Sequence, residues 1–256
     1  MTPWNPDEYL RFGDERTRPS VDLASRIAVE SPSLVIDLGC GPGNSTRVLR
    51  DRWPEAHVIG LDSSAEMIDA ARAEMPQEEW IHSGIEEWNP PQAFDVVFSN
   101  AALQWLPDHS ALVQRLFAAV APGGALGFQI PSASFAAVRT LIHAIALDGP
   151  WTPRMTGPLG ALTMESPGVY YDCLSPEARS VDIWETEYFH VMDSHAAIVD
   201  WIGSTGLRPF LDALGSETEK QQFVSRLDRA VRQTYPLQQD GRVLFPFRRT
   251  FVIAYR

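Results

Sequence analysis

A glycine-rich turn near the start of the chain carries the strongest sign of ligand binding. Gly39, Gly41 and Gly43 alternate there, directly after an apolar run that contains Asp37. A second apolar run ends in Asp62, 19 residues after Gly43. Glycine lets the backbone approach a ligand because no Cβ stands in the way, and an acidic residue at the end of the next strand can accept hydrogen bonds from a ribose diol. Together these signals predict a site for a nucleoside-bearing cofactor.

The spacing of the glycines and the neighbouring carboxylate narrow the choice of cofactor. A dinucleotide site has the spacing G-x-G-x-x-G, whereas this turn has G-x-G-x-G with Pro42 inside it. Asp37 would repel a pyrophosphate but would attract a cationic ammonium. These features favour S-adenosylmethionine, which has an amino-acid end and a ribose end. A nicotinamide cofactor and a glycine turn that binds no ligand are the alternatives.

The elements around this turn alternate between strand and helix patterns. Apolar runs predict strands at about 33–38, 57–62, 80–82, 94–100 and 125–130. Helices are predicted at about 43–53, 64–75 and 109–121, the second of them capped by Ser64. Such alternation predicts a mostly parallel, Rossmann-like α/β sheet, whose ligands bind beyond the carboxyl ends of the strands.

The pattern changes outside this alternating region. Residues 4–27 predict a helical arm that Pro19 interrupts, and a strand is predicted at 181–191, followed by two or three helices. We therefore expect one domain whose last strand is antiparallel. Its parts are an arm at 1–30, a cofactor-binding half at 31–131, helical lid insertions at 132–180 and 194–240, and a closing hairpin at 241–256.

Composition excludes several classes of function. The net charge of −12 argues against nucleic-acid binding, which depends on clustered cations. No apolar run approaches the length of a membrane span, and the N-terminus lacks a signal-peptide pattern. The two cysteines cannot form a metal cluster. We expect a cytoplasmic protein without a metal, in which Cys40 is a packing residue.

Positive charge accumulates toward the C-terminus of this acidic chain. Nine of the 21 Lys and Arg residues follow residue 193, against six of the 33 Asp and Glu residues. Arginine binds carboxylates through paired hydrogen bonds. The bias of cations toward arginine also fits genome composition, but the C-terminal arginines are candidates for an anion site.

Several segments beyond the glycine turn are shared with one family. The pattern D-x-G-x-G-x-G resembles motif I of the class I methyltransferases. Over nearly its whole length, the chain resembles the bacterial trans-aconitate 2-methyltransferases, through segments 4–16, 100–105, 201–211 and 244–249. The resemblance implies that one carboxylate of trans-aconitate is methylated by S-adenosylmethionine, giving the monomethyl ester and S-adenosylhomocysteine.

The motif positions and the resemblance together predict the residues that bind the cofactor. Arg16 is expected to pair with the methionine carboxylate, unless it is a solvated helical charge. Ile85 and Met67 are expected to cover the two faces of the adenine, although Met67 could equally serve helix packing. The full predicted set is Tyr9, Phe12, Arg16, Asp37, Gly39, Cys40, Gly41, Asn44, Asp62, Ser63, Met67, Ser83, Gly84, Ile85, Asn100, Ala101, Ala102 and Trp105.

The acceptor site follows from the chemistry of a carboxylate. A carboxylate is ionised at neutral pH, so no general base is required. Gln104 and Trp105 are expected near the reacting centre, and His109 is expected to start a helix rather than to catalyse. The carboxylates that do not react would be bound by Arg208 and by one of Arg248 and Arg249, because adjacent strand residues face opposite sides. Tyr170, Tyr171 or Trp184 would shape the pocket.

Two other functions remain open from the sequence alone. The enzyme could methylate a different acid, such as a malonyl group on a carrier protein. Alternatively, the chain could be a catalytically silent partner subunit that binds the cofactor. The intact glycines and both aspartates argue against the silent subunit, and the sequence leaves the oligomeric state undetermined.

Overall fold

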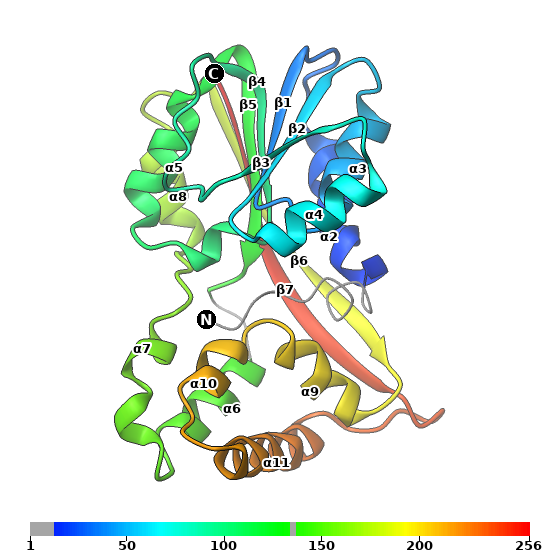
Figure 1. The fold of residues 1–256 in the computed structure, drawn as a ribbon, viewed down its shortest axis with the longest axis vertical. Helices are drawn as coiled ribbons and strands as arrows, with labels where there is room; N and C mark the ends of the chain where they lie inside the picture. Colours follow the sequence, from blue (N-terminus) through cyan, green and yellow to red (C-terminus); the bar gives the residue numbers. More distant parts are fainter. Residues whose placement is uncertain (1–12, 134–136) are drawn as a thin grey trace. The chain divides into compact units, whose positions relative to one another are not determined.

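The structure is a computed structural model that describes residues 13–133 and 137–256. Its main feature is a seven-stranded sheet in the order β3-β2-β1-β4-β5-β7-β6 (Figure 1). The strands are β1 (Leu34–Leu38), β2 (His57–Asp62), β3 (Glu79–His82), β4 (Phe94–Asn100), β5 (Val120–Pro131), β6 (Ser180–Met192) and β7 (Val243–Tyr255). Strands β1 to β5 pair in parallel, and β7 pairs antiparallel with β5. The predicted Rossmann-like α/β class is confirmed.

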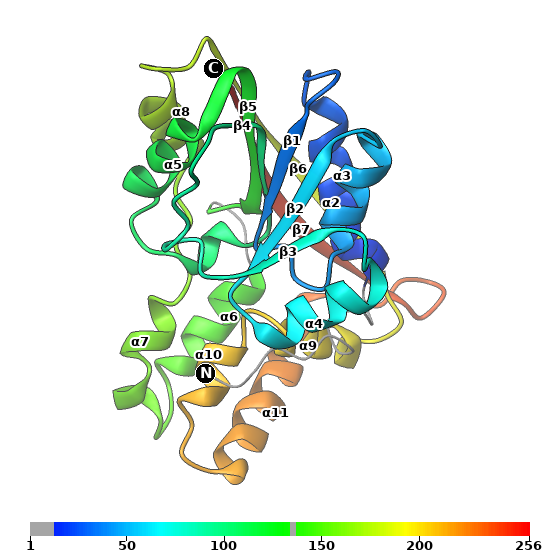
Figure 2. The same ribbon diagram turned by 45° about the horizontal axis from the view of Figure 1, so that its top comes forward.

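Helices cover both faces of the first five strands (Figures 1 and 2). One face carries α2 (Gly13–Arg26), α3 (Asn44–Arg52) and α4 (Ala65–Glu74), and the other carries α5 (His109–Ala118) and α8 (Pro167–Leu174). Strand β4 is buried along almost its entire length, as expected for a parallel strand covered on both faces. Because these strands are parallel, their carboxyl ends lie at one edge of the sheet, where the predicted motifs lie.

The N-terminal helix runs through the proline that was predicted to interrupt it. Helix α2 contains Pro19 in its interior. Proline in a helix interior costs about 3 kcal/mol, but full burial of one Leu or Ile contributes about 1.5–3 kcal/mol. Leu23 and Ile27 are both fully buried, and a Cβ on Gly127 of β5 would lie only 2.8 Å from the Ile27 side chain. The packing of α2 against the sheet therefore outweighs the proline.

The C-terminal segment is one strand, which corrects the hairpin predicted at 241–256. Strand β7 continues through Pro246 and pairs with β5 from Arg249 to Tyr255. The turn lies earlier, where Gly241 has a positive φ of 82° and donates its N–H to the Gln238 carbonyl. Proline is tolerated where a strand does not need its N–H for the ladder. The apolar alternation could not reveal that the turn precedes Val243.

The described residues form two compact units, each with its own core. The sheet unit comprises residues 13–133, Thr163–Thr186 and Arg249–Arg256, and the helical unit comprises 137–162 and Glu187–Arg248. Strands β6 and β7 contribute residues to both. The helical unit contains α6 (Ala137–Ala146), α7 (Thr156–Leu159), α9 (His195–Gly203), α10 (Arg208–Asp212) and α11 (Glu217–Thr234), which confirms the helices predicted after residue 194. Across 13–133 and 137–256, no helix has the length and apolar composition that crossing a bilayer requires.

Candidate functional site

The glycine turn between β1 and α3 has a backbone conformation that favours glycine. Gly39, Gly41 and Gly43 have φ values of 73°, 55° and 94°, in the left-handed region that other residues rarely adopt. A Cβ on Gly39 would lie 2.2 Å from the Ala102 Cβ, whereas a Cβ on Gly41 would meet no described atom within 4 Å. The loop after β4 therefore fills the space beside Gly39, whereas the space beside Gly41 is open among the described residues. An open cradle of this kind fits a ligand that approaches the backbone.

Asp62 links the end of β2 to the same turn. Its Oδ2 accepts a hydrogen bond from the Gly41 backbone N–H at 2.9 Å, and its Oδ1 accepts one from the Ser64 N–H at 2.9 Å. Burial raises the pKa of Asp62, while the two backbone donors act in the opposite direction. A carboxylate has about four acceptor positions. Asp62 therefore holds the turn in place and keeps acceptor capacity for the predicted ribose diol.

Asp37 is a fully buried carboxyl group beneath the turn. Its Oδ2 accepts hydrogen bonds from the hydroxyls of Ser45 and Thr46, at 2.6 and 2.7 Å. Desolvation raises the pKa of Asp37 to about 6, against the opposing effect of these two hydroxyls. Within the described part of the chain, its buried Oδ1 has no hydrogen-bond partner. A buried acceptor without a donor fits the ammonium of a ligand amino-acid end.

The loop after β3 lies beside Asp62, as predicted for the adenine end. The Ser83 backbone N–H donates to the Asp62 carbonyl at 3.0 Å. Ile85 and Met67 are both buried, and the Met67 N–H donates to the Ser64 hydroxyl at 3.3 Å, which confirms Ser64 as the N-cap of α4. Ser63 is exposed. The adenine contacts of this loop stay a prediction.

The N-terminal helix borders the start of α3. The Asn44 side chain, at the first position of α3, donates to the Thr17 hydroxyl at 3.4 Å. Arg16 precedes Thr17 on α2 and is buried, so the alternative of a solvated helical charge is wrong. Tyr9 and Phe12 lie outside the described residues. The pairing of Arg16 with a methionine carboxylate stays a prediction.

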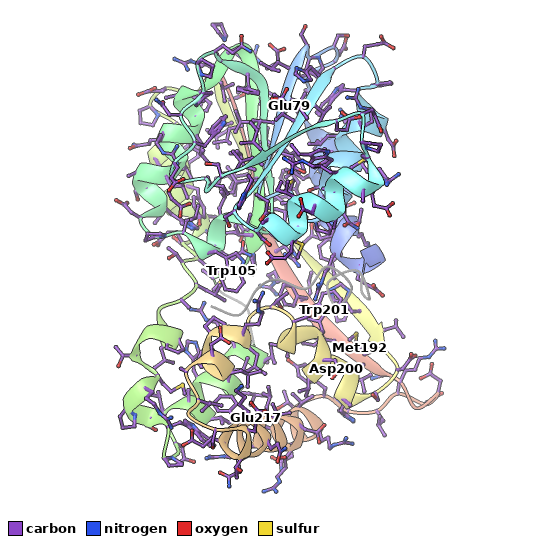
Figure 3. The ribbon with its side chains drawn as sticks, viewed as in Figure 1. Glu79, Trp105, Met192, Asp200, Trp201 and Glu217 are labelled. Atoms are coloured by element: carbon purple, nitrogen blue, oxygen red, sulfur yellow. The ribbon has the colours of Figure 1, made fainter. Side chains whose placement is uncertain are left out.

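The loop after β4 has a constrained backbone. Ala101 has a φ of 56°, which is unusual for a residue other than glycine. The Gln104 side chain stabilises it by donating to the Ala101 carbonyl at 2.6 Å, and the buried Gln104 Oε1 has no hydrogen-bond partner within residues 13–133 and 137–256. Figure 3 shows Trp105 at the end of the sheet unit where β4 terminates. The loop thus presents polar groups at the carboxyl edge of the sheet.

The adjacent arginines of β7 have different environments. Arg249 is buried, and its Nη1 donates to Gln129 Oε1 at 3.3 Å, whereas Arg248 is half-exposed and its Nη2 lies 3.3 Å from Glu187 Oε1. This confirms that adjacent strand residues diverge. Gln129 Nε2 in turn donates to Asn100 Oδ1 at 2.6 Å. Gln129 is a site residue that was not predicted, although a polar residue near the end of an apolar strand is a usable signal.

The helical unit contains Arg208, which was predicted to bind the acceptor, and Trp201, which begins the segment 201–211 that resembles the family. Arg208 is the first residue of α10, and its backbone N–H donates to the Thr205 carbonyl at 3.0 Å. Trp201 lies on α9 (Figure 3), with its ring centroid 4.7 Å from that of His190. The role of Arg208 in binding an anion stays a prediction.

Tyr170 is a core residue, and its predicted role in shaping the substrate pocket stays a prediction. It is fully buried, and its hydroxyl lies 2.5 Å from His109 Nδ1 and accepts the Glu165 N–H at 3.1 Å. The other His109 nitrogen lies 2.9 Å from the Leu103 carbonyl. Burial lowers the pKa of His109. His109 begins α5, so its interpretation as a helix-start residue is confirmed.

The two remaining aromatic candidates also differ. The Trp184 ring stacks on Phe251 at a centroid distance of 4.8 Å, and the Arg26 guanidinium lies 4.3 Å from the Trp184 ring centroid. These contacts pack Trp184 on the α2 face of the sheet, and its role in shaping the substrate pocket stays a prediction. Tyr171 is about half-exposed, and a substrate contact by Tyr171 stays a prediction.

Cys40 and the acidic residues show no sign of nucleophilic or metal chemistry. Cys40 is buried in a cluster with Ile68, Met75 and Trp80, and burial raises the pKa of its thiol. A thiol must be ionised to act as a nucleophile, so the packing interpretation of Cys40 is confirmed. Across the described residues, no group of three or more His, Cys, Asp or Glu side chains could hold a metal ion.

Solved structures share this fold at low sequence identity. The YcgJ protein from Bacillus subtilis matches with a TM-score of 0.62 and 14% identity, over 93% of this chain and 98% of that one. A phosphoethanolamine N-methyltransferase 2 from Haemonchus contortus, solved with S-adenosyl-L-methionine, matches with a TM-score of 0.56 and 14% identity, over 93% of this chain and 52% of that one. These likenesses establish the class I methyltransferase fold.

Sequence comparison identifies the family. Residues 35–124, which contain the glycine turn and Asp62, match the profile of a methyltransferase domain. A trans-aconitate 2-methyltransferase from Methylobacterium radiotolerans is 47% identical over 259 residues, covering 99% of this chain and 98% of that protein. The Azoarcus sp. protein of the same name is 43% identical over 256 residues, with full coverage of both. The glycine turn and the full-length identity agree, and this chain belongs to the trans-aconitate 2-methyltransferase family.

Proposed function

We propose that this chain transfers the methyl group of S-adenosylmethionine to one carboxylate of trans-aconitate. The observation that carries the proposal is the open turn at Gly41, bordered by the anchored carboxylate of Asp62 and the buried carboxylate of Asp37. This arrangement supports a ligand with a ribose at one end and an ammonium at the other. The relatives at 43–47% identity supply the acceptor, because their names specify trans-aconitate.

The reaction is a direct displacement. Bound S-adenosylmethionine supplies an electrophilic methyl group, and an acceptor oxygen forms the new C–O bond while the electron pair of the breaking C–S bond stays on sulfur. A carboxylate with a pKa near 4 is already ionised, so the protein need not remove a proton. The environment of His109 agrees with a reaction that needs no general base. Both of its ring nitrogens lie within hydrogen-bonding distance of protein atoms. Catalysis then depends on alignment of the reactants and exclusion of water.

The acceptor carries three carboxylates, so it needs cationic partners. Arg249 is our assignment for the sheet unit, because it is buried and its guanidinium is oriented by Gln129. Arg208 is the second proposed partner of these carboxylates, whereas Arg248 leaves the opposite side of β7 from Arg249 and lies beside Glu187. Gln104 and Trp105 are proposed to contact the reacting end.

A methyl-transfer assay tests the function directly. Purified protein with isotopically labelled S-adenosylmethionine is offered trans-aconitate, cis-aconitate, citrate and a malonyl-carrier protein in separate reactions. We expect efficient labelling of trans-aconitate and an ester that is released by mild base. Labelling of the carrier protein alone would redirect the assignment to that acceptor, and no transfer to any of the acids would refute the proposal.

A further inference from the structure

Three buried polar side chains form a hydrogen-bonded chain across strands β7, β5 and β4. Arg249 Nη1 donates to Gln129 Oε1 at 3.3 Å, and Gln129 Nε2 donates to Asn100 Oδ1 at 2.6 Å. Asn100 and Gln129 are register partners, and Arg249 pairs with Pro131, two residues further along β5. The three side chains are therefore neighbours on one face of the sheet.

The arginine determines the direction of every hydrogen bond in this chain. A guanidinium has donors only, so the Gln129 group that faces Arg249 must be its carbonyl oxygen. The Gln129 amide nitrogen must then face Asn100, and the side-chain carbonyl oxygen of Asn100 accepts its hydrogen bond. Asn100 then has its NH₂ group as a donor for a further partner, while its oxygen already accepts from Gln129. The uncertainty of amide orientation that usually affects Asn and Gln is removed by the fixed charge at the end of the chain.

A donor at Asn100 complements the acceptor at Asp37 on the neighbouring strand. Asp37 pairs with Phe98 in the register of β1 and β4, and Asn100 lies two residues beyond Phe98. Side chains two residues apart leave the same face of a strand, about 7 Å apart. The sheet unit thus presents a buried acceptor and an oriented donor to the same edge. This polarity matches a zwitterion, with its ammonium toward Asp37 and its carboxylate toward Asn100.

We propose that Asn100 donates to a carboxylate of a bound ligand, and that Gln129 is a positioning residue that fixes this polarity by linking Asn100 to Arg249. The inference rests on the proposed function and deepens it. The carboxylate belongs either to the amino-acid end of the cofactor or to the acceptor. An ammonium does not fit the Asn100 NH₂ group, because both groups would be donors.

Two variants reverse the polarity while conserving side-chain size. Asn100→Asp still accepts from Gln129 but replaces the donors by a negative charge. Gln129→Glu leaves only acceptors, so Asn100 must turn its amide nitrogen inward and point its carbonyl at the ligand. The matched controls are Asn89→Asp and Gln92→Glu, which make the same changes at exposed positions of the sheet unit. Thermal unfolding of all four proteins checks that the fold is retained, and Asn100→Asp tests the donor role even if Gln129→Glu does not fold.

Calorimetric titration with two ligands separates a role in binding from a structural one. S-adenosylhomocysteine has the amino-acid end, whereas 5′-methylthioadenosine lacks it. We expect Asn100→Asp and Gln129→Glu to weaken S-adenosylhomocysteine at least about tenfold, as loss of one charge-assisted hydrogen bond implies. The affinity for 5′-methylthioadenosine should change less than about twofold, and the controls should bind both ligands like the wild type.

A kinetic arm identifies the source of the carboxylate. If S-adenosylhomocysteine affinity is retained but the KM for trans-aconitate rises about tenfold at saturating S-adenosylmethionine, Asn100 donates to the acceptor instead of to the cofactor. Unchanged or tighter S-adenosylhomocysteine binding together with an unchanged KM would overturn the proposal. The titrations need no acceptor, so a failure of methyl transfer to trans-aconitate leaves this result distinguishable from a failure of the proposed function.

Discussion

The two units differ in where they place charge. In the sheet unit, four charged side chains are buried: Arg16, Asp37, Glu78 and Arg249. Among the described residues of the helical unit, the buried polar side chains are His190 and His195, and ion pairs such as Arg154–Glu219 and Arg232–Asp228 are partly exposed. Exposed pairs contribute little to stability, whereas a buried charge is costly unless it is matched. The sheet unit therefore sustains a cost that the helical unit avoids.

The buried charges of the sheet unit differ in whether a partner within the protein offsets the free-energy cost of their burial. Glu78 is matched by Arg50, whose Nε donates to Glu78 Oε1 at 2.8 Å, and this pair serves packing. Asp37 receives only hydroxyl hydrogen bonds among the described contacts, and one of its oxygens is left over. A buried carboxyl with a raised pKa and an unused acceptor is a candidate for function. We therefore expect changes in the sheet unit to affect cofactor binding and changes at Arg208 to affect acceptor binding.

The largest effect is expected for a methyl group added inside the glycine turn. Gly41 and Gly123 both have positive φ, of 55° and 82°, and a Cβ on either would meet no described atom within 4 Å. Ala at either position should cost about 1–2 kcal/mol of backbone strain. Only Gly41→Ala also fills the proposed cradle, so its kcat/KM for S-adenosylmethionine should fall about 100-fold, while Gly123→Ala keeps it. Equal activities in steady-state assays would remove the turn from the site.

The next effect concerns the helical unit. Arg208→Ala should raise the KM for trans-aconitate about 10- to 100-fold, because a charge-assisted pair with a carboxylate is lost. The KM for S-adenosylmethionine should not change. Arg232→Ala is the matched control, since Arg232 already pairs with Asp228 on the same helix. An unchanged KM for trans-aconitate in Arg208→Ala would show that this arginine does not bind the acceptor.

Two smaller effects are expected at Asp37, a gain in stability and a loss of ligand affinity. Asp37→Asn keeps an oxygen for Ser45 and Thr46 but removes a buried charge. The pKa of Asp37 is raised from 3.8 to about 6 in the folded state, so its ionisation destabilises the ligand-free protein, by about 1–3 kcal/mol at neutral pH. The variant should unfold at higher denaturant concentration yet bind S-adenosylhomocysteine about tenfold more weakly. A variant that is both less stable and equally tight in binding would contradict the assigned role.

The smallest effect is a pH dependence. Because the folded pKa of Asp37 lies above its unfolded value, the contribution of this group to stability is lost as pH rises from about 4 through about 6. Other groups titrate in this range as well, so the quantity to measure is the difference in unfolding free energy between wild type and Asp37→Asn. That difference should grow in favour of the variant up to about pH 6 and then level off. S-adenosylhomocysteine affinity of the wild type should rise over the same interval if Asp37 binds an ammonium.

Local features of the cofactor site could be predicted from the sequence. The turn at Gly39–Gly43 required only that glycine tolerates positive φ, and the position of Asp62 required only that an apolar run ends there. The strand and helix periods then place both at the carboxyl edge of a parallel sheet. Each inference depends on residues that are close in sequence, where backbone preference and periodicity act.

Features that depend on several distant segments were decided by the tertiary structure. Tyr170 and Trp184 have the composition of pocket residues, but the packing of α8 and α2 buries one and stacks the other. The continuity of β7 through Pro246 depends on pairing with β5.

The fold class, the cofactor turn and the alternation of Arg248 and Arg249 could be predicted from the amino-acid sequence, since they follow from local backbone geometry. The burial of Arg249, and its connection to Asn100 through Gln129, became visible in the folded sheet. The physical reason is that burial and hydrogen-bond direction depend on which strands become neighbours. Strand β7 (Val243–Tyr255) lies far from β4 and β5 in the sequence and meets β5 only in the folded sheet.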